Sequence, residues 1–249
     1  MATITAPTLT AHRAPVDWTR GNARAAGIFY LVTFAASVPA AFYFLAPILN
    51  DPNYIVSSGA DTRVLIGCLL DVVTALAGIG SAVAVFPVVR RQNESMALGF
   101  VTSRMFEAAV IMVGVVSLLA VVTLRQSGVT GAEHGSLVTT GHALVAVRNY
   151  TFQFGPNLSA AVNGLLFGTL LYKSRLVPRF IPIMGLVAAP LLLVATIATV
   201  SGLTEQGSAW FAPGGALIFV WELSVGTYMT VKGFKPSSIT ARTPEVPLG

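Results

Sequence analysis

Four ionisable side chains stand inside long apolar stretches of the sequence, where they could bind a proton or a small ligand. They are Asp71, Arg104, Glu107 and Glu222. A charged side chain at the centre of a lipid bilayer costs at least about 2.5–3.5 kcal/mol, so such residues face one another or a water-filled cavity rather than lipid. Three carboxyl groups could carry protons or hold a ligand there, with the arginine as their counter-ion.

The composition indicates that these apolar stretches lie in a membrane. The chain has 249 residues, of which 54% are hydrophobic and 10% are charged. Soluble domains carry about 25% charged residues, because they must cover their surface with polar groups. We therefore expect the lipid bilayer to be the main partner. The net charge of +5 does not indicate nucleic acid, since the basic residues lie in short clusters between apolar stretches.

Six stretches are long enough to cross about 30 Å of hydrocarbon, which takes about 20 residues. They cover residues 25–49, 63–89, 96–124, 151–172, 180–200 and 213–231, and a short interfacial helix is expected over 137–149. Lipid permits helices or closed barrels, and the strict alternation of a barrel strand is missing. The predicted fold is an all-α polytopic membrane bundle of about six transmembrane helices over residues 23–235. The polar segments 1–22 and 236–249 are predicted to be disordered.

The distribution of basic residues predicts the orientation. With six spans, eleven lysines and arginines fall on one side of the membrane and three on the other. The three are Arg63, Arg125 and Arg148. Because cytoplasmic loops carry the excess of basic residues, we expect a multi-pass protein of the cytoplasmic membrane with both termini in the cytoplasm.

The four embedded residues are predicted to lie at similar depths. At about 1.5 Å of rise per residue, all four fall in a slab about 6 Å thick near the bilayer centre. Arg104 and Glu107 are three residues apart and share a helix face. We therefore expect the second, third and sixth spans to meet there. Three acids against one base leave an excess of negative charge, and an unpaired acid in this apolar setting is expected to hold its proton.

Two interpretations of this polar cluster remain open. It could be the proton or ligand site of a small transporter or proton-coupled carrier, whose substrate the sequence does not name. Alternatively, it could be a buried clasp that fixes helix packing in a structural or partner-binding subunit, including a homo-oligomer. A third hypothesis, a membrane-embedded enzyme acting on lipid, would need a nucleophile or metal cluster at interfacial depth, and the sequence offers neither. We expect no cofactor.

Two further groups of residues are interpreted as structural. Asn163, Gly164 and Gly168 fall in the fourth span, where an amide and a pair of small residues favour helix packing. Cys68 lies in an apolar stretch and is expected to be a small buried side chain, since one cysteine cannot form an intrachain disulfide.

The histidines do not predict a metal site. His134 and His142 lie near Glu133, but their spacing on a glycine-rich loop is not that of a known ligand set, and we expect no bound metal. Aromatic residues near the predicted span ends are typical of the membrane–water interface, and they are Trp18, Tyr172 and Trp210.

Several segments, in order and spacing, resemble one family of bacterial membrane proteins. The segments are residues 23–31, 103–108, 172–179, 221–224 and 231–236. Over about Asn22 to Ser237, the chain is similar to the domain-of-unknown-function family 4386. The resemblance implies a multi-helix membrane protein without an established activity, and it supplies no catalytic residues. It does place Arg104, Glu107 and Glu222 within family segments.

Overall fold

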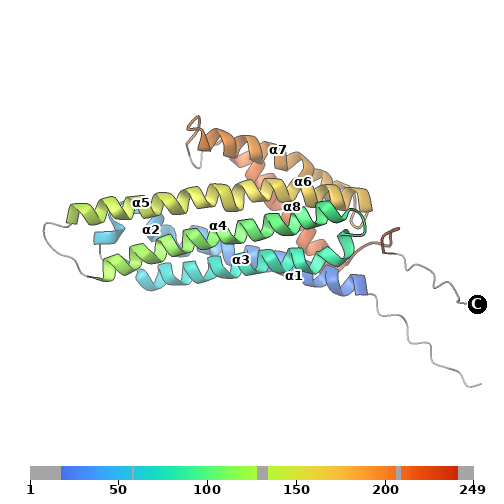
Figure 1. Cartoon of the computed structure of the whole chain (residues 1–249), viewed down its shortest axis with the longest axis horizontal. Coiled ribbons are helices and arrows are strands. Elements are labelled where there is room, and N and C mark those ends of the chain that lie inside the picture. Colours follow the sequence, from blue (N-terminus) through green and yellow to red (C-terminus); the bar gives the residue numbers. More distant parts are fainter. Residues whose placement is uncertain (1–17, 58, 128–133, 206–208, 241–249) are drawn as a thin grey trace, which may run out of the picture.

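The protein is built from helices that run along one long axis (Figure 1). The computed structural model describes residues 18–57, 59–127, 134–205 and 209–240. Within these residues there is no strand, which confirms the all-α prediction. Five helical segments are long and apolar enough to cross a membrane: α1 (Trp18–Pro39) with the π-helical turn η1 (Ala40–Phe44), α3 (Asp61–Val89), α4 (Glu94–Gln126), α7 (Phe180–Val200) and α8 (Ala212–Val231). The short α2 (Ala46–Asn50) and the 3₁₀ turn η2 (Tyr54–Val56) connect α1 to α3.

One further helical run lies in the position of the predicted fourth span, outside the five candidate spans. Helix α5 (His134–Phe152), the π-helical turn η3 (Gln153–Leu158) and α6 (Ser159–Ser174) follow one another without a break. The run is about 60 Å long at about 1.5 Å per residue, and it packs along α4 (Figure 1). Together with the five segments, it is consistent with about six crossings.

This continuity differs from the sequence prediction, which separated an interfacial helix at 137–149 from a span at 151–172. The helix continues through Tyr150 because the residues around it contain no helix breaker. Pro156, which cannot donate a backbone hydrogen bond, falls within η3, and a π-helical turn is a known way to accommodate such an interruption.

The ends of the bundle also differ from the predicted boundaries. Helix α1 begins at Trp18 rather than after residue 22, and the Arg91 guanidinium lies 4.5 Å from the centre of the Trp18 ring. At the other terminus, residues 236–240 are described, and the carbonyl of Ile239 accepts a hydrogen bond from Arg91 Nη1. Arg91 thus contacts both ends of the described chain. Residues 1–17 and 241–249 lie outside the described part of the chain.

The crossing helices form a closed ring. In order around it, α1 packs on α3, α3 on α4, α4 on α6, α6 on α7, α7 on α8, and α8 on α1. Both described ends of the chain lie at one end of this ring, here called the terminal end; the other end, which holds α2 and η2, is called the loop end (Figure 1).

Two separate hydrophobic clusters stabilise the ring. The terminal-end cluster joins α1, α3, α4, α6, α7 and α8 through residues such as Val85, Phe100, Phe167 and Trp221. The loop-end cluster joins α2, η2, α3 and α4 through residues such as Ile48, Tyr54, Val64 and Leu118. Along α4, Arg104 lies between Phe100 of the terminal-end cluster and Ala108 of the loop-end cluster.

A glycine closes the ring at the α1–α8 contact. A Cβ on Gly27 would lie 2.6 Å from the carbonyl oxygen of Gly226 and would also overlap the side chain of Thr230. Only a residue without a side chain permits this approach, as expected for helices that pack in lipid.

Gly27→Val is therefore expected to lower the free energy of unfolding by about 1–3 kcal/mol, the usual cost of overpacking. Gly21→Val is the matched control, because a Cβ on Gly21, in the same helix, meets nothing within 4 Å. The comparison is made by titrating the purified proteins with dodecyl sulfate. Equal stability of the two variants would contradict the close α1–α8 contact.

Candidate functional site

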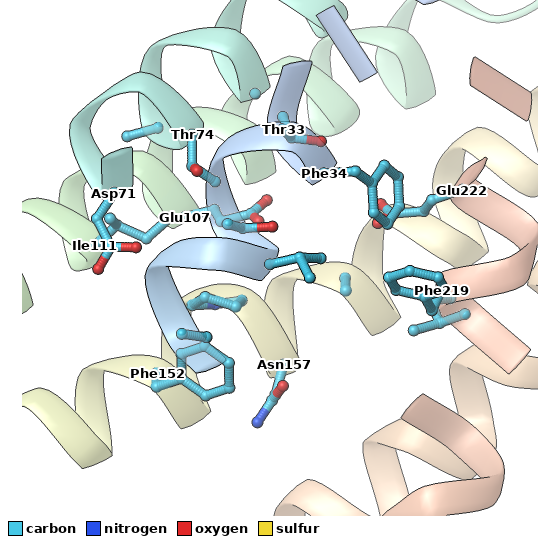
Figure 2. A pocket seen from close by; sticks show the side chains of 18 of the residues that line it. Thr33, Phe34, Asp71, Thr74, Glu107, Ile111, Phe152, Asn157, Phe219 and Glu222 are labelled. Carbon is cyan, nitrogen blue, oxygen red and sulfur yellow. The ribbon is translucent and has the colours of Figure 1, made fainter. Parts of the chain in front are cut away.

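A cavity of about 380 Å³ lies between the two hydrophobic clusters. Its lining comes from α1, η1, α3, α4, α5, η3, α6, α7 and α8, so every crossing element contributes to it (Figure 2). Both π-helical turns reach it, through Phe42 of η1 and Asn157 of η3. The volume is in the range of small-molecule sites, and π-helical turns within α-helices are frequent at functional sites.

Arg104 joins two carboxylates on the cavity wall. Its Nη1 atom donates to Glu107 Oε2 at 3.0 Å, and its Nη2 atom donates to Glu222 Oε1 at 2.8 Å. The arginine is buried, and its guanidinium lies 5.0 Å from the ring centre of Tyr30. One guanidinium thus links α4 to α8 across 118 residues of sequence. The structure brings together three of the four residues in the predicted cluster.

Asn163 belongs to this group as well. Its Nδ2 atom donates to Glu107 Oε2 at 3.0 Å, and the side chain is fully buried. The sequence grouped Asn163 with Gly164 and Gly168 as packing residues. The two glycines do lie against α7, where a Cβ on Gly164 would be 3.0 Å from the Cβ of Ala189 and one on Gly168 would be 3.3 Å from Leu186. Within α6, the amide therefore faces the polar site while the glycines face a neighbouring helix.

Asp71 makes a different ion pair from the one expected. It accepts a hydrogen bond from Arg148 Nη2 at 2.9 Å, and both residues are buried. The prediction that Arg148 lies on the far side of the membrane with Arg63 and Arg125 was wrong, because α5 continues past residue 149 and carries Arg148 into the bundle. The stretch from His142 to Phe154 contains no glycine or proline, and this was the available signal.

A glycine also permits this second ion pair. A Cβ on Gly114 of α4 would lie 2.9 Å from Arg148 Cδ and 2.6 Å from Thr151 Oγ1. Helix α5 therefore packs close to α4, and the guanidinium of Arg148 extends toward Asp71 on α3.

The two ion pairs lie at different depths, whereas a single slab was expected. Counted from the turn between α3 and α4, Arg104 is about 15 Å along α4 and Asp71 is about 27 Å along α3. The expected depth of Asp71 was obtained by subtracting its distance from one end of α3 from a roughly 30 Å bilayer. This failed because α3 has 29 residues and is about 44 Å long. Both levels nevertheless border the same cavity.

The arginine at the loop-end terminus of α4 is also paired, but outside the cavity. Arg125 Nε donates to Asp61 Oδ1 at 2.7 Å, and the Tyr54 hydroxyl donates to the same oxygen at 2.9 Å. Burial and this hydrogen bond raise the pKa of Tyr54 above its usual range. The contacts fasten η2 to the ends of α3 and α4.

The remaining candidates lie away from the cavity. His142 Nε2 is 2.8 Å from the Pro52 carbonyl oxygen, whereas Glu133 lies outside the described residues. Cys68 is buried in the loop-end cluster. Trp210 is largely exposed. Within the described residues, no group of three or more histidine, cysteine and acidic side chains could hold a metal ion.

These features define a multi-pass, all-helical membrane protein with a charged cavity inside its bundle. The model of the family described as "Domain of unknown function (DUF4386)" matches residues 25–233, and the chain belongs to this family. The match confirms the family resemblance and includes every residue of the three ion pairs that Arg104 and Arg148 make with Glu107, Glu222 and Asp71. No curated protein and no solved structure matches the chain.

Arg148→Leu is expected to lower the free energy of unfolding by about 3 kcal/mol, because it leaves Asp71 buried without its partner. The double variant Asp71→Asn/Arg148→Leu should recover much of the loss, since the remaining amide carries no charge. Arg90→Leu serves as the surface control. Detergent-solubilised proteins are compared by dodecyl sulfate titration, and a double variant no more stable than Arg148→Leu would contradict the pairing.

Proposed function

We propose that this protein is a small proton-coupled carrier and that the cavity is its central binding site. Glu107 and Glu222 are the proton-carrying groups in this proposal, and Arg104 is their counter-ion. The observation that supports it most is the position of the charges: they lie on the wall of a cavity bordered by every crossing element, between two hydrophobic clusters. Carrier sites are typically found near the middle of the membrane at such a helix junction.

The sharing of Arg104 suggests how a proton could change the structure. Its Nη1 atom holds Glu107 of the same helix, and its Nη2 atom holds Glu222 of α8. A proton on Glu222 would weaken the ionic link between α4 and α8, while Glu107 would still neutralise the arginine. Proton binding would then favour a conformation in which α8 is free to move, and a ligand that binds one conformation better shifts the balance between them.

Aromatic packing separates the cavity from the terminal end. Phe167 stacks on Phe100 with ring centres 4.7 Å apart and meets the edge of Trp221 at 6.5 Å. Tyr30 also stacks with Phe167, with ring centres 6.1 Å apart. These rings are fully buried in the terminal-end cluster and support a state that is closed toward that end.

The proposal includes the orientation. The terminal end carries the loops with Arg90 and Arg91 and with Lys173, Arg175 and Arg179. Because an excess of basic residues marks cytoplasmic loops, we place the terminal end, with both chain termini, on the cytoplasmic side of the cytoplasmic membrane. The state described would then be closed to the cytoplasm.

A structural role is the second candidate. The same link from Arg104 to Glu222 connects two helices distant in sequence, which suits a clasp that fixes the packing of a structural or partner-binding subunit. A clasp would need no movement of protons. The two functions therefore predict different effects when one carboxylate is replaced by a neutral side chain.

We expect Glu107→Gln to abolish proton movement while the protein stays folded. A glutamine oxygen can still accept from Arg104 and Asn163, whereas its amide cannot carry a proton at this site. The wild-type protein, in liposomes that contain a pH-sensitive dye, should move protons after a pH jump, and the variant at least tenfold more slowly. Glu94→Gln, an exposed acid at the start of the same helix, is the matched control.

Two results would count against the carrier. If wild-type protein moves no protons under a gradient of either direction, the carrier is discarded. If Glu107→Gln unfolds in detergent while Glu94→Gln does not, the carboxylate is needed for packing and the clasp is favoured.

A further inference from the structure

The charged groups do not face the cavity equally. The side chains of Glu107 and Glu222 are 13% and 15% exposed, whereas that of Arg104 is 5% exposed. The second pair shows no such difference, with 10% for Asp71 and 8% for Arg148. At the Arg104 group, a bound molecule would therefore meet carboxylate oxygens, which accept hydrogen bonds and attract positive charge, more than guanidinium donors.

The charge balance of the lining favours the same kind of ligand. Among the described lining residues there are three carboxylates and two guanidiniums. Both Nη atoms of Arg104 are already bonded to glutamates, and the Asn157 amide donates to Gln153 at 2.9 Å. The lining thus carries a formal charge of −1 with its carboxylates ionised, which one monovalent cation would neutralise.

Aromatic rings surround this acidic surface. Phe34 and Phe219 form an edge-to-face pair with ring centres 4.8 Å apart, and Figure 2 shows them beside Glu222. Phe152 lines the cavity near Asn157 (Figure 2). Ring faces attract cations, most strongly where water is excluded, and they also pack against apolar groups.

The cavity also reaches the outer surface of the bundle. Phe42 of η1 and Phe219 of α8 line it, yet they are 81% and 43% exposed. Helix α1 packs along α8 through Gly27, but η1, which continues α1, packs on α3 rather than on α8. An apolar molecule dissolved in the lipid could therefore reach the carboxylates between η1 and α8.

We propose that the cavity binds a lipophilic organic cation, such as a hydrophobic amine or a quaternary ammonium or phosphonium ion, which enters from the lipid between η1 and α8. Its charge lies against Glu107 and Glu222, and its apolar groups lie against Phe34, Phe42 and Phe219. The proposal rests on the proposed function and names the class of molecule that the carrier would accept.

Tetraphenylphosphonium and tetraphenylborate test this directly, because the two ions share size and shape and differ in the sign of their charge. Binding is measured by equilibrium dialysis against the full chain in phosphatidylcholine nanodiscs, with protein-free nanodiscs subtracted. We expect saturable binding of tetraphenylphosphonium and at least tenfold weaker binding of tetraphenylborate. Binding of the smaller cation tetrapropylammonium is measured in parallel. If it binds and tetraphenylphosphonium does not, the phenyl rings are too large for the cavity.

Two variants assign the binding to the proposed residues. Glu222→Gln should weaken cation binding at least tenfold, and Glu107→Gln provides the same test if Glu222→Gln does not fold. Phe219→Ala should weaken it several-fold, while Glu94→Gln should leave it unchanged. The proposal is overturned if neither cation binds, if the borate binds as tightly as the phosphonium, or if neither glutamate variant changes the affinity.

The outcome can be separated from that of the carrier proposal, because dialysis needs no proton gradient. Cation binding without proton movement would reject the carrier and keep the ligand class. Proton movement without cation binding would reject the ligand class and keep the carrier.

Discussion

The guanidinium of Arg104, shared by two carboxylates inside an apolar bundle, is the interaction on which the rest of the structure depends. Lipid cannot solvate these groups, so each must face a partner within the protein or the cavity. Arg104 pairs with both carboxylates, Glu107 on its own helix and Glu222 on α8. The requirement fixes the rotation of α4 and brings α8 to it, while Asn163 provides a further donor from α6.

Packing around this polar level follows from small residues. Gly27 lets α1 approach α8, and Gly114 lets α5 approach α4 closely enough for Arg148 to meet Asp71. Residues of both hydrophobic clusters border the cavity, and the charged groups line it at two levels. The π-helical turns η1 and η3 border the cavity, where regular side-chain packing is interrupted. The same features that hold the helices together thus leave space for a ligand beside the carboxylates.

Hydrophobicity and length were sufficient to predict the helical membrane fold and the association of Arg104 with Glu107 and Glu222, and the predicted count of about six spans is consistent with the five candidate spans and the run from α5 to α6. These properties depend on local composition and on the cost of an embedded charge, both of which a single sequence contains. The partner of Asp71 depended on where α5 ends: the sequence predicted a boundary near Tyr150, whereas α5 continues to Phe152 and then into η3. The role of Asn163 depended on the rotation of α6 about its axis, which small residues alone do not determine. The cavity itself arises from the joint packing of all crossing elements, for which the sequence has no local signal.

The most direct test of this account is the coupling free energy between Arg104 and Glu222, measured with a double-mutant cycle. The free energy of unfolding is determined for the wild type, Arg104→Leu, Glu222→Gln and the double variant in the same detergent. A buried link between α4 and α8 predicts a favourable coupling of at least about 1 kcal/mol. Effects of the two substitutions that add to within about 0.3–0.5 kcal/mol would show that the residues act independently, and would contradict the account.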